Sequence, residues 1–327
     1  MRSEPPVSSQ RLHRAEAGQY IGPVHRSAVA GSTAQRLGPE RSANGSAGVP
    51  QVPARIEDLG AADLRSALAG GEFSLAYQPI VSAATGAITS CEGLLRWQHP
   101  SLGPISPADF IPLAERTGAI GPIGAWVLET ACRQAAAWPE FCRVSVNVSP
   151  VQLQDPDFAD RVVATLLATG LAACRLELEL TEGVPMGDVA VALEGVAAIR
   201  ALGVSIALDD FGTGFSSLGY LQRFTFDRLK IDRTFITGLG EARESWFLVR
   251  TMHDIARHFG MAVTAEGIET EDEARMLREI GATELQGFLF SRPVTGEAAT
   301  ALLREQSHRL RSGKAGRRTK FLDHAVP

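Results

Sequence analysis

The sequence predicts an α/β fold in which eight strands close into a (β/α)8 TIM-like barrel, with one antiparallel strand near the N-terminus. Short apolar strand-like segments alternate with helical stretches across about 230 residues, and their number is that of a closed barrel. Only a short turn around Gly86 separates the first two strand-like segments. Because this turn is too short for a helical crossover, we expect these two strands to form an antiparallel hairpin.

Each expected strand is a short, mainly apolar run. The eight runs are 73–81, 87–97, 143–149, 174–180, 204–210, 227–232, 261–266 and 284–288. Helical stretches follow most of them, which is the chain order of parallel βα units. These stretches are 107–116, 122–138, 157–169, 188–201, 243–259, 270–280 and 295–306.

Composition divides the chain of 327 residues into three parts. Residues 1–55 are rich in Ser, Gly, Pro, Ala and Arg without a hydrophobic period, so we expect a disordered leader. Residues 56–306 form the expected barrel. Hydrophobic residues make up 45% of the whole chain, which is enough for a sizeable core. Residues 307–327 are expected to be a basic tail. Solvated tails of this kind mostly carry no function, and contact with a membrane surface or a partner is the alternative.

Charge and cysteine content argue against several classes of protein. Residues 56–303 hold 18 Lys and Arg against 32 Asp and Glu, a charge of −14 that suits no nucleic-acid polymer. If this part binds a phosphate ligand, metal ions are the obvious source of positive charge. No apolar run has the length of a transmembrane segment, and the N-terminus lacks a secretory signal. The four cysteines have no CxxC spacing, which indicates reduced thiols and a cytoplasmic location.

Polar side chains recur at or near the carboxyl ends of the expected strands. Alternation in 143–149 places Asn147 on the face opposite the valines, and alternation in 174–180 places Glu179 opposite the leucines. The other members of this set are Glu92, Asp209, Asp210, Lys230, Glu266 and Gln286. Because the carboxyl ends of barrel strands meet at the face where active sites of this fold lie, we expect these side chains to converge.

The chemistry of this set favours a metal site. Several carboxylates in one pocket raise each other's pKa, and divalent cations remove that conflict. No histidine lies in an expected strand, so the donors are oxygen atoms, which favour Mg2+ or Mn2+ over Zn2+. The adjacent Asp209 and Asp210 suit two bridged ions. A single acid at a strand end more often caps a helix or pairs with an arginine, but the shared position of six donors favours metal.

Eight motifs, in order, resemble those of the EAL-domain phosphodiesterases, which hydrolyse cyclic di-GMP. They are YQPIV (77–81), EGLLRW (92–97), VNVS (146–149), ELTE (179–182), DDFGTGFSSL (209–218), LKID (229–232), AEGIET (265–270) and QGFLFSRP (286–293). The resemblance covers nearly all of the globular part. It implies that residues 56–306 are an EAL-type catalytic barrel whose first strand is antiparallel.

The resemblance also implies a role for each candidate residue. Two Mg2+ or Mn2+ ions would be held by Glu92, Asn147, Glu179, Asp209, Asp210 and Glu266, with Asp209 as the bridge. Lys230 would orient or deprotonate the attacking water with support from Asp232, and Glu266 joins them as a catalytic residue. Arg96 would reach a substrate phosphate, Gln78 and Gln286 would line the pocket, and Glu182 would anchor loop 209–218.

The implied function is two-metal hydrolysis of cyclic di-GMP to linear 5′-pGpG, which lowers the level of a bacterial second messenger. A homodimer is expected on the same resemblance. The main alternative is a catalytically silent cyclic-di-GMP receptor or partner-binding EAL module, which would bind the ligand without turnover. A different metal-dependent barrel enzyme, such as a lyase, is a third hypothesis because fold alone does not determine chemistry.

Three positions depart from the family pattern without removing a metal or lysine position. Gly93 makes the signature EGL instead of EAL, Phe215 stands where Tyr is frequent, and Gly183 stands where Ser is frequent. A glycine within a strand destabilises the strand by about 0.5–1 kcal/mol. Because Gly93 follows Glu92, the position of the Glu92 side chain is the feature that this glycine affects most. Because the ligand is Glu92 and the loss is one methyl group, we expect activity to survive.

Overall fold

The computed structural model describes residues 55–181, 189–213, 217–240 and 243–312, all within one compact unit. The expected leader, apart from Arg55, and the tail beyond residue 312 lie outside the described residues. The expectations for Glu182, Gly183 and Phe215 also fall outside them. Within the described part, no helix combines the length and the apolar character that crossing a bilayer requires.

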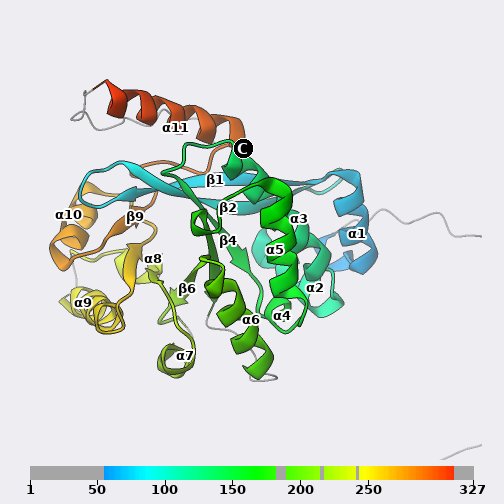
Figure 1. Ribbon diagram of the computed structural model, residues 1–327, viewed down its shortest axis with the longest axis horizontal. Coiled ribbons are helices and arrows are strands. Elements are labelled where there is room, and N and C mark those ends of the chain that lie inside the picture. Colours follow the sequence, from blue (N-terminus) through cyan, green and yellow to red (C-terminus); the bar gives the residue numbers. More distant parts are fainter. Residues whose placement is uncertain (1–54, 182–188, 214–216, 241–242, 313–327) are drawn as a thin grey trace, which may run out of the picture. The chain divides into compact units, whose positions relative to one another are not determined.

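The strands form a closed barrel (Figure 1). Its eight strands are β1 (Phe73–Ser82), β2 (Ile88–His99), β4 (Arg143–Val148), β5 (Leu176–Thr181), β6 (Ser205–Phe211), β7 (Arg228–Ile231), β8 (Ala262–Ala265) and β9 (Glu284–Gln286). They pair in the order β1, β9, β8, β7, β6, β5, β4, β2, and β2 pairs again with β1. The last pairing closes the sheet, so the predicted barrel is confirmed.

The first strand differs from the others in direction. β1 is antiparallel to both of its neighbours, β2 and β9, whereas the remaining neighbours in the barrel are parallel. The predicted hairpin is therefore confirmed, with Gln78 directly opposite Glu92. A short strand that we did not predict, β3 (Gly103–Ile105), pairs antiparallel with the carboxyl end of β2.

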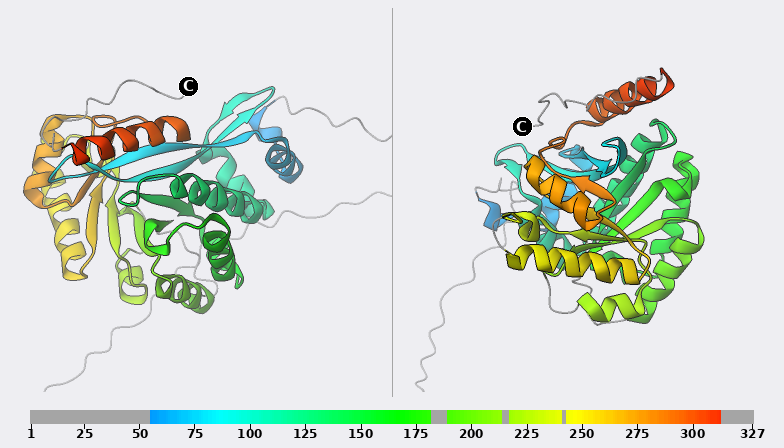
Figure 2. Two further views of the ribbon diagram at one scale, coloured as in Figure 1. Left: turned by 45° about the horizontal axis from the view of Figure 1, so that its top comes forward. Right: turned by 90° about the vertical axis from the view of Figure 1, so that its left-hand side faces the viewer.

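Helices lie outside the strands (Figures 1 and 2). They are α1 (Ala61–Gly70), α2 (Pro107–Thr117), α3 (Ile120–Ala136), α4 (Pro150–Leu153), α5 (Phe158–Thr169), α6 (Val189–Ala201), α7 (Ser217–Arg223), α8 (Arg233–Ile236), α9 (Arg243–His258), α10 (Glu271–Ile280) and α11 (Gly296–Arg311). The 3-10 turns are η1 (Ile56–Asp58) and η2 (Ala173–Arg175). All seven expected helices are present, with ends shifted by a few residues. The last helix, α11, continues five residues past its expected end.

The apolar core lies between the strands and the helices. On β5, Leu176, Leu178 and Leu180 are buried on the face that packs against helices, as the alternation predicts. The interior of the barrel is lined by polar side chains instead. Glu177 and Glu179 of the same strand are both buried there. Ionisable side chains therefore lie inside the barrel, where they can contact one another.

An ion layer lies near the amino ends of the strands and consists of Arg143, Glu177, Arg228 and Glu284. Arg228 Nε is 2.9 Å from Glu177 Oε2, and Arg228 Nη1 is 2.8 Å from Glu284 Oε2. Arg143 Nη2 is 2.7 Å from Glu284 Oε1. These contacts join strands that are not neighbours in the sheet, so the ion layer ties the barrel together across its interior.

The ion layer predicts how stability depends on pH. Burial acts to raise the pKa of Glu284, but Arg228 and Arg143 outweigh burial and lower it. A carboxyl with a lowered folded pKa stabilises above its unfolded pKa of about 4.3, and this stabilisation is lost as the pH falls. We expect the melting temperature of the native protein to exceed that of Glu284→Gln most at pH 7, and the difference to shrink towards pH 3. A difference that stays constant over this range would contradict the assignment.

Candidate active site

The amino group of Lys230 lies at the centre of four carboxylates, three near the carboxyl ends of their strands and one, Glu92, within β2. Its Nζ is 2.7 Å from Glu266 Oε1, 2.8 Å from Glu179 Oε2 and 3.1 Å from Asp209 Oδ1. Glu92 Oε2 is further away, at 3.8 Å. We call these five residues the carboxylate site. They come from β2, β5, β6, β7 and the end of β8, so the predicted convergence takes place.

Three amide side chains extend the carboxylate site on the side of Glu92. Asn147 Nδ2 donates to Glu92 Oε1 at 2.8 Å, and Gln286 Nε2 donates to Glu92 Oε2 at 2.8 Å. Gln286 also donates to Gln78 Oε1 at 3.2 Å, and Gln78 donates to the carbonyl of Ser291 at 3.1 Å. The two amides bonded to Glu92 fix both of its oxygens. The cross-strand pairing of Gln78 with Glu92 explains why Gln78 lies beside them.

Strand alternation explains why the two polar layers lie one above the other. Side chains two residues apart on a strand point to the same face. Four residues of the carboxylate site and its amide neighbours therefore lie two positions after an ion-layer residue or after Thr264, which bonds to the ion layer. The pairs are Glu177 and Glu179, Arg228 and Lys230, Thr264 and Glu266, and Glu284 and Gln286. Glu177 lies on the same face of its strand as Glu179, as the alternation predicts, but neither it nor Arg228, Thr264 and Glu284 was among the candidate site residues.

The carboxylates of the site hold more negative charge than one lysine balances. Burial and the charge of Glu92 hold the pKa of Glu179 well above its ordinary value. Burial also raises the pKa of Glu266, to about 8, with Asp209 adding to it and Lys230 opposing it. Burial acts to raise the pKa of Glu92 too, but Lys230 and the amide hydrogen bonds outweigh burial and lower it. Glu266 thus favours the protonated form near neutral pH, and Glu179 takes up a proton more readily than an ordinary glutamate.

Lys230 itself stays charged. Burial acts to lower the pKa of its amino group, but the surrounding carboxylates, with Asp209 first, raise it well above the ordinary value. The side chain is 1% exposed, so solvent does not replace these partners.

Asp210 and Asp232 lie at the edge of the carboxylate site. Asp210 has φ 54°, a left-handed conformation unusual outside glycine, and its amide donates to Asp209 Oδ1 at 3.0 Å. Burial and the charge of Asp209 raise the pKa of Asp210 to about 6. Asp232 caps helix α8 by accepting from the amide of Thr234 at 2.9 Å. The helix-cap interpretation of a strand-end acid therefore holds for Asp232.

Arg96 contacts none of the carboxylates. Its Nη1 donates to the carbonyl of Leu95 at 3.0 Å, and burial lowers the pKa of the half-buried guanidinium despite the charge of Glu92.

A cleft of about 240 Å3 opens beside the carboxylate site. It is lined by Gln78, Glu92, Leu94, Asp232, Arg233, Glu266, Gly267, Glu269, Gln286, Gly287 and Phe288. Phe288 is half exposed, and the guanidinium carbon of Arg292 lies 4.3 Å from the centre of its ring. The cleft therefore joins carboxylates and amides to an aromatic surface and gives a ligand access to them.

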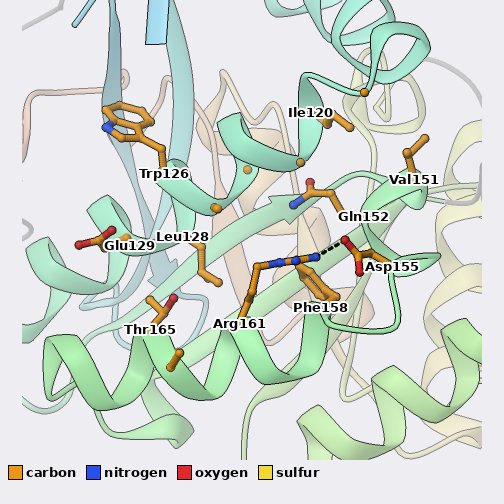
Figure 3. A pocket seen from close by; sticks show the side chains of 15 residues that line it. Ile120, Trp126, Leu128, Glu129, Val151, Gln152, Asp155, Phe158, Arg161 and Thr165 are labelled. Carbon is orange, nitrogen blue, oxygen red and sulfur yellow. Dashed lines mark hydrogen bonds and ion pairs between the residues drawn. The ribbon is translucent and has the colours of Figure 1, made fainter. Parts of the chain in front are cut away.

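A second cavity, of about 450 Å3, lies between α3, α4 and α5 (Figure 3). Leu128, Phe158 and small residues line it, and Arg161 pairs with Asp155 at its edge. It shares no lining residue with the cleft and holds none of the predicted site residues.

The donor set of the carboxylate site fits Mg2+ or Mn2+. Its donors are oxygen atoms, which these ions prefer. Glu179 Oε1 is buried without a hydrogen-bond partner, and a cation would satisfy it. The excess of negative charge also matches a divalent ion. Among the described residues, no three Asp, Glu, His or Cys side chains already surround one point at ligating distance, since Lys230 is at the centre.

Comparison with known proteins places this geometry in a family. Residues 61–293 match the family model of the EAL domain. The chain belongs to the EAL-domain family. It is 46% identical over 244 residues to y4lL, an uncharacterized protein of Sinorhizobium fredii, which covers 75% of this chain and 30% of y4lL. The family resemblance noted in the sequence is thereby confirmed.

Two further matches carry functional names. MucR of Pseudomonas aeruginosa, a bifunctional diguanylate cyclase/cyclic di-GMP phosphodiesterase, is 41% identical over 243 residues, which are 73% of this chain and 36% of MucR. The structure of the PaMucR phosphodiesterase in complex with c-di-GMP is 41% identical, with a TM-score of 0.68, and the match covers 73% of this chain and 98% of that one. The EAL chain thus spans only about a third of the length of the curated relatives it matches.

Proposed function

We propose that this EAL-domain protein is a metal-dependent phosphodiesterase that hydrolyses cyclic di-GMP to linear 5′-pGpG. The observation that carries the proposal is the carboxylate site itself, in which four acids and Lys230 converge beside an open cleft. The likeness to the PaMucR phosphodiesterase in its c-di-GMP complex supports the choice of substrate. A homodimer is part of the same proposal, and light scattering of the purified protein tests it.

In this proposal Glu92, Asn147, Glu179 and Asp209 would hold one Mg2+ or Mn2+ ion. Asp209, Asp210 and Glu266 would hold a second ion. Such ions would supply an activated water and stabilise charge on the phosphoryl oxygens. Asn147 is exposed, and Asp210 and Glu266 are more accessible than the fully buried Glu179. The proposed ligands therefore include accessible side chains as well as buried ones.

The chain's own residues orient the substrate and the attacking water. Lys230 is charged, which favours a role in orienting the water or neutralising a phosphate oxygen over a role as the base. Asp232 supports the site from the start of α8. Gln78 and Gln286 line the cleft that receives the ligand, and Glu182 is proposed to anchor loop 209–218. Arg96 is proposed to reach a substrate phosphate, and its bond to the Leu95 carbonyl uses only Nη1 of the guanidinium.

The deciding experiment is incubation of the purified protein with cyclic di-GMP and Mn2+ or Mg2+, with chromatography of the products. We expect 5′-pGpG to form with either metal and not after chelation. Calorimetric binding of cyclic di-GMP without any linear product would contradict the proposal and favour the silent receptor. Turnover of an unrelated carboxylate substrate would instead favour a different barrel enzyme.

The EGL signature gives a second, sharper prediction. A Cβ added at Gly93 would lie 3.5 Å from the carbonyl oxygen of Ser145 and 3.8 Å from Ala131 and Tyr77, which are ordinary contacts. Alanine therefore fits, and it stiffens the strand next to Glu92. We expect Gly93→Ala to hydrolyse cyclic di-GMP at an equal or higher rate and to be up to about 1 kcal/mol more stable. Loss of turnover in this variant would show that the glycine has a role of its own.

A further inference from the structure

We propose that Arg228 is a positioning residue for the carboxylate site, an inference that rests on the function proposed above. Arg228 is buried on β7, two residues before Lys230, and none of its contacts is with the four carboxylates of that site. Its guanidinium instead contacts three other strands. Nε bonds Glu177 Oε2 at 2.9 Å, Nη1 pairs with Glu284 Oε2 at 2.8 Å, and Nη1 donates to Thr264 Oγ1 at 3.2 Å.

Each partner of Arg228 lies two positions in sequence before a residue of the carboxylate site or before its amide neighbour Gln286. Glu177 of β5 precedes Glu179, Thr264 of β8 precedes Glu266, and Glu284 of β9 precedes Gln286. Arg228 itself precedes Lys230. Because the two members of a pair are joined by one extended residue, the position of the first determines that of the second. One planar guanidinium thus sets the spacing of four strands in the layer next to the carboxylate site.

The ion layer extends this tie to β4. Glu284 also pairs with Arg143, at 2.7 Å, and Ser145 Oγ lies 3.5 Å from Glu177 Oε1. Two arginines and two glutamates make the layer neutral. Without Arg228, two buried carboxylates would share one remaining arginine, which contacts only Glu284. We infer that β5 and β9 would then move apart and carry Glu179 and Gln286 with them.

The geometry of arginine is required for this role. Guanidinium is a planar fork that bonds several acceptors in fixed directions, whereas the amino group of lysine is a compact charge. A displacement of about 1 Å at a reacting centre, caused by a change elsewhere in the structure, can reduce turnover by about 100-fold. We therefore expect Arg228→Gln to lower kcat by about 10-fold to 100-fold with a much smaller change in KM, and to weaken Mn2+ binding.

The experiment compares three variants with the native protein at a temperature well below every melting transition. Arg228→Gln tests the residue. Arg228→Gln/Glu177→Gln keeps the ion layer neutral, and it is expected to recover melting temperature without recovering kcat. Arg175→Gln is the matched control, because Arg175 makes three hydrogen bonds to the carbonyls of Cys142, Ala135 and Pro139 outside the barrel interior. We expect this control to lose stability and keep both kcat and Mn2+ affinity.

Each variant is measured by kcat, by KM and by calorimetric titration with Mn2+ in the absence of substrate. The proposal is overturned if Arg228→Gln stays within twofold of the native kcat, if the neutral double variant recovers kcat along with stability, or if Arg175→Gln loses as much kcat. If Arg228→Gln does not fold, the double variant and Arg228→Lys decide: both are expected to fall below the native kcat, and a native kcat in both would overturn the proposal. If the native protein has no hydrolysis, the proposed function fails, and Mn2+ affinity alone then decides the role of Arg228.

Discussion

Replacing Lys230 with alanine is expected to lower the hydrolysis of cyclic di-GMP by about 100-fold to 10,000-fold, the range for a residue that positions a proton or a charge in the reaction. Among the described residues, Lys230 is the cation that pairs with Glu92, Glu179, Asp209 and Glu266. Its removal takes away both the charge near the scissile phosphate and the group that holds the four acids in their present arrangement.

The same variant is expected to be less stable without metal. Breaking a buried ion pair by removal of one partner costs about 3–5 kcal/mol, because the other charge stays buried without compensation. The acids respond by taking up protons, so their folded pKa values rise further. A raised folded pKa stabilises below the unfolded pKa and this contribution is lost as the pH rises. We therefore expect the deficit of Lys230→Ala in melting temperature to be larger at pH 8 than at pH 5.

Two measurements separate the effect of the Lys230 charge from that of its side-chain volume, and the loss of stability from the loss of turnover. Lys230→Met keeps most of the side-chain volume, and we expect it to lose as much hydrolysis as alanine while it recovers the part of the stability due to the cavity. Added Mn2+ is expected to raise the melting temperature of both variants without restoring turnover. Hydrolysis within tenfold of the native rate in Lys230→Met would contradict the role assigned to the charge.

The alternation of side chains along each strand predicted most of the carboxylate site. Leu178 and Leu180 pack outside the barrel, so Glu179 between them must face the interior, and the same rule holds for Asn147 between its valines. The closed barrel follows from the number of strands and brings these positions together. The local rule and the fold together predicted that these acids converge, but they also placed Asp210 among them, and Lys230 pairs with the other four.

The ion layer was not predicted because its contacts cross the barrel. Arg143 on β4 and Glu284 on β9 are far apart in the order of strands, and only closure of the sheet brings them to 2.7 Å. Both are also the first residues of their strands, where the expected segment has little alternation before it. Their charges alone did not indicate that Arg143 and Glu284 pair with each other.

Short elements were missed for a different reason. Helix α1 buries only Leu64 and Ala67, which is too little to give a helical period in the sequence. Strand β3 has three residues, with Pro104 at its centre, a residue that demotes a strand in sequence analysis. Neither contributes to the cleft or to the carboxylate site.

Replacing Gly287 with alanine is expected to have the second largest effect. An added Cβ would lie 2.0 Å from the carbonyl oxygen of Ile268, 2.3 Å from its amide nitrogen and 2.6 Å from its carbonyl carbon. These are backbone atoms, and they are held by bonds from Ile268 N to the Gln286 carbonyl at 3.1 Å and from Leu289 N to the Ile268 carbonyl at 3.0 Å. The two segments must separate, which we expect to cost about 3 kcal/mol or more.

The separation would also displace the carboxylate site, because Gln286 precedes Gly287 and Glu266 lies two residues before Ile268. A displacement of about 1 Å at a reacting centre is enough to reduce turnover by about 100-fold, so we expect that loss of kcat in Gly287→Ala at a temperature where the variant is folded. Gly195→Ala is the control: this glycine lies within α6, nothing is within 4 Å of an added Cβ, and alanine should stabilise the helix by up to about 1 kcal/mol with kcat unchanged. An unchanged melting temperature in Gly287→Ala would mean that the two segments move apart at no cost, and the close packing that holds Gln286 against Glu92 would then not be a requirement for the site.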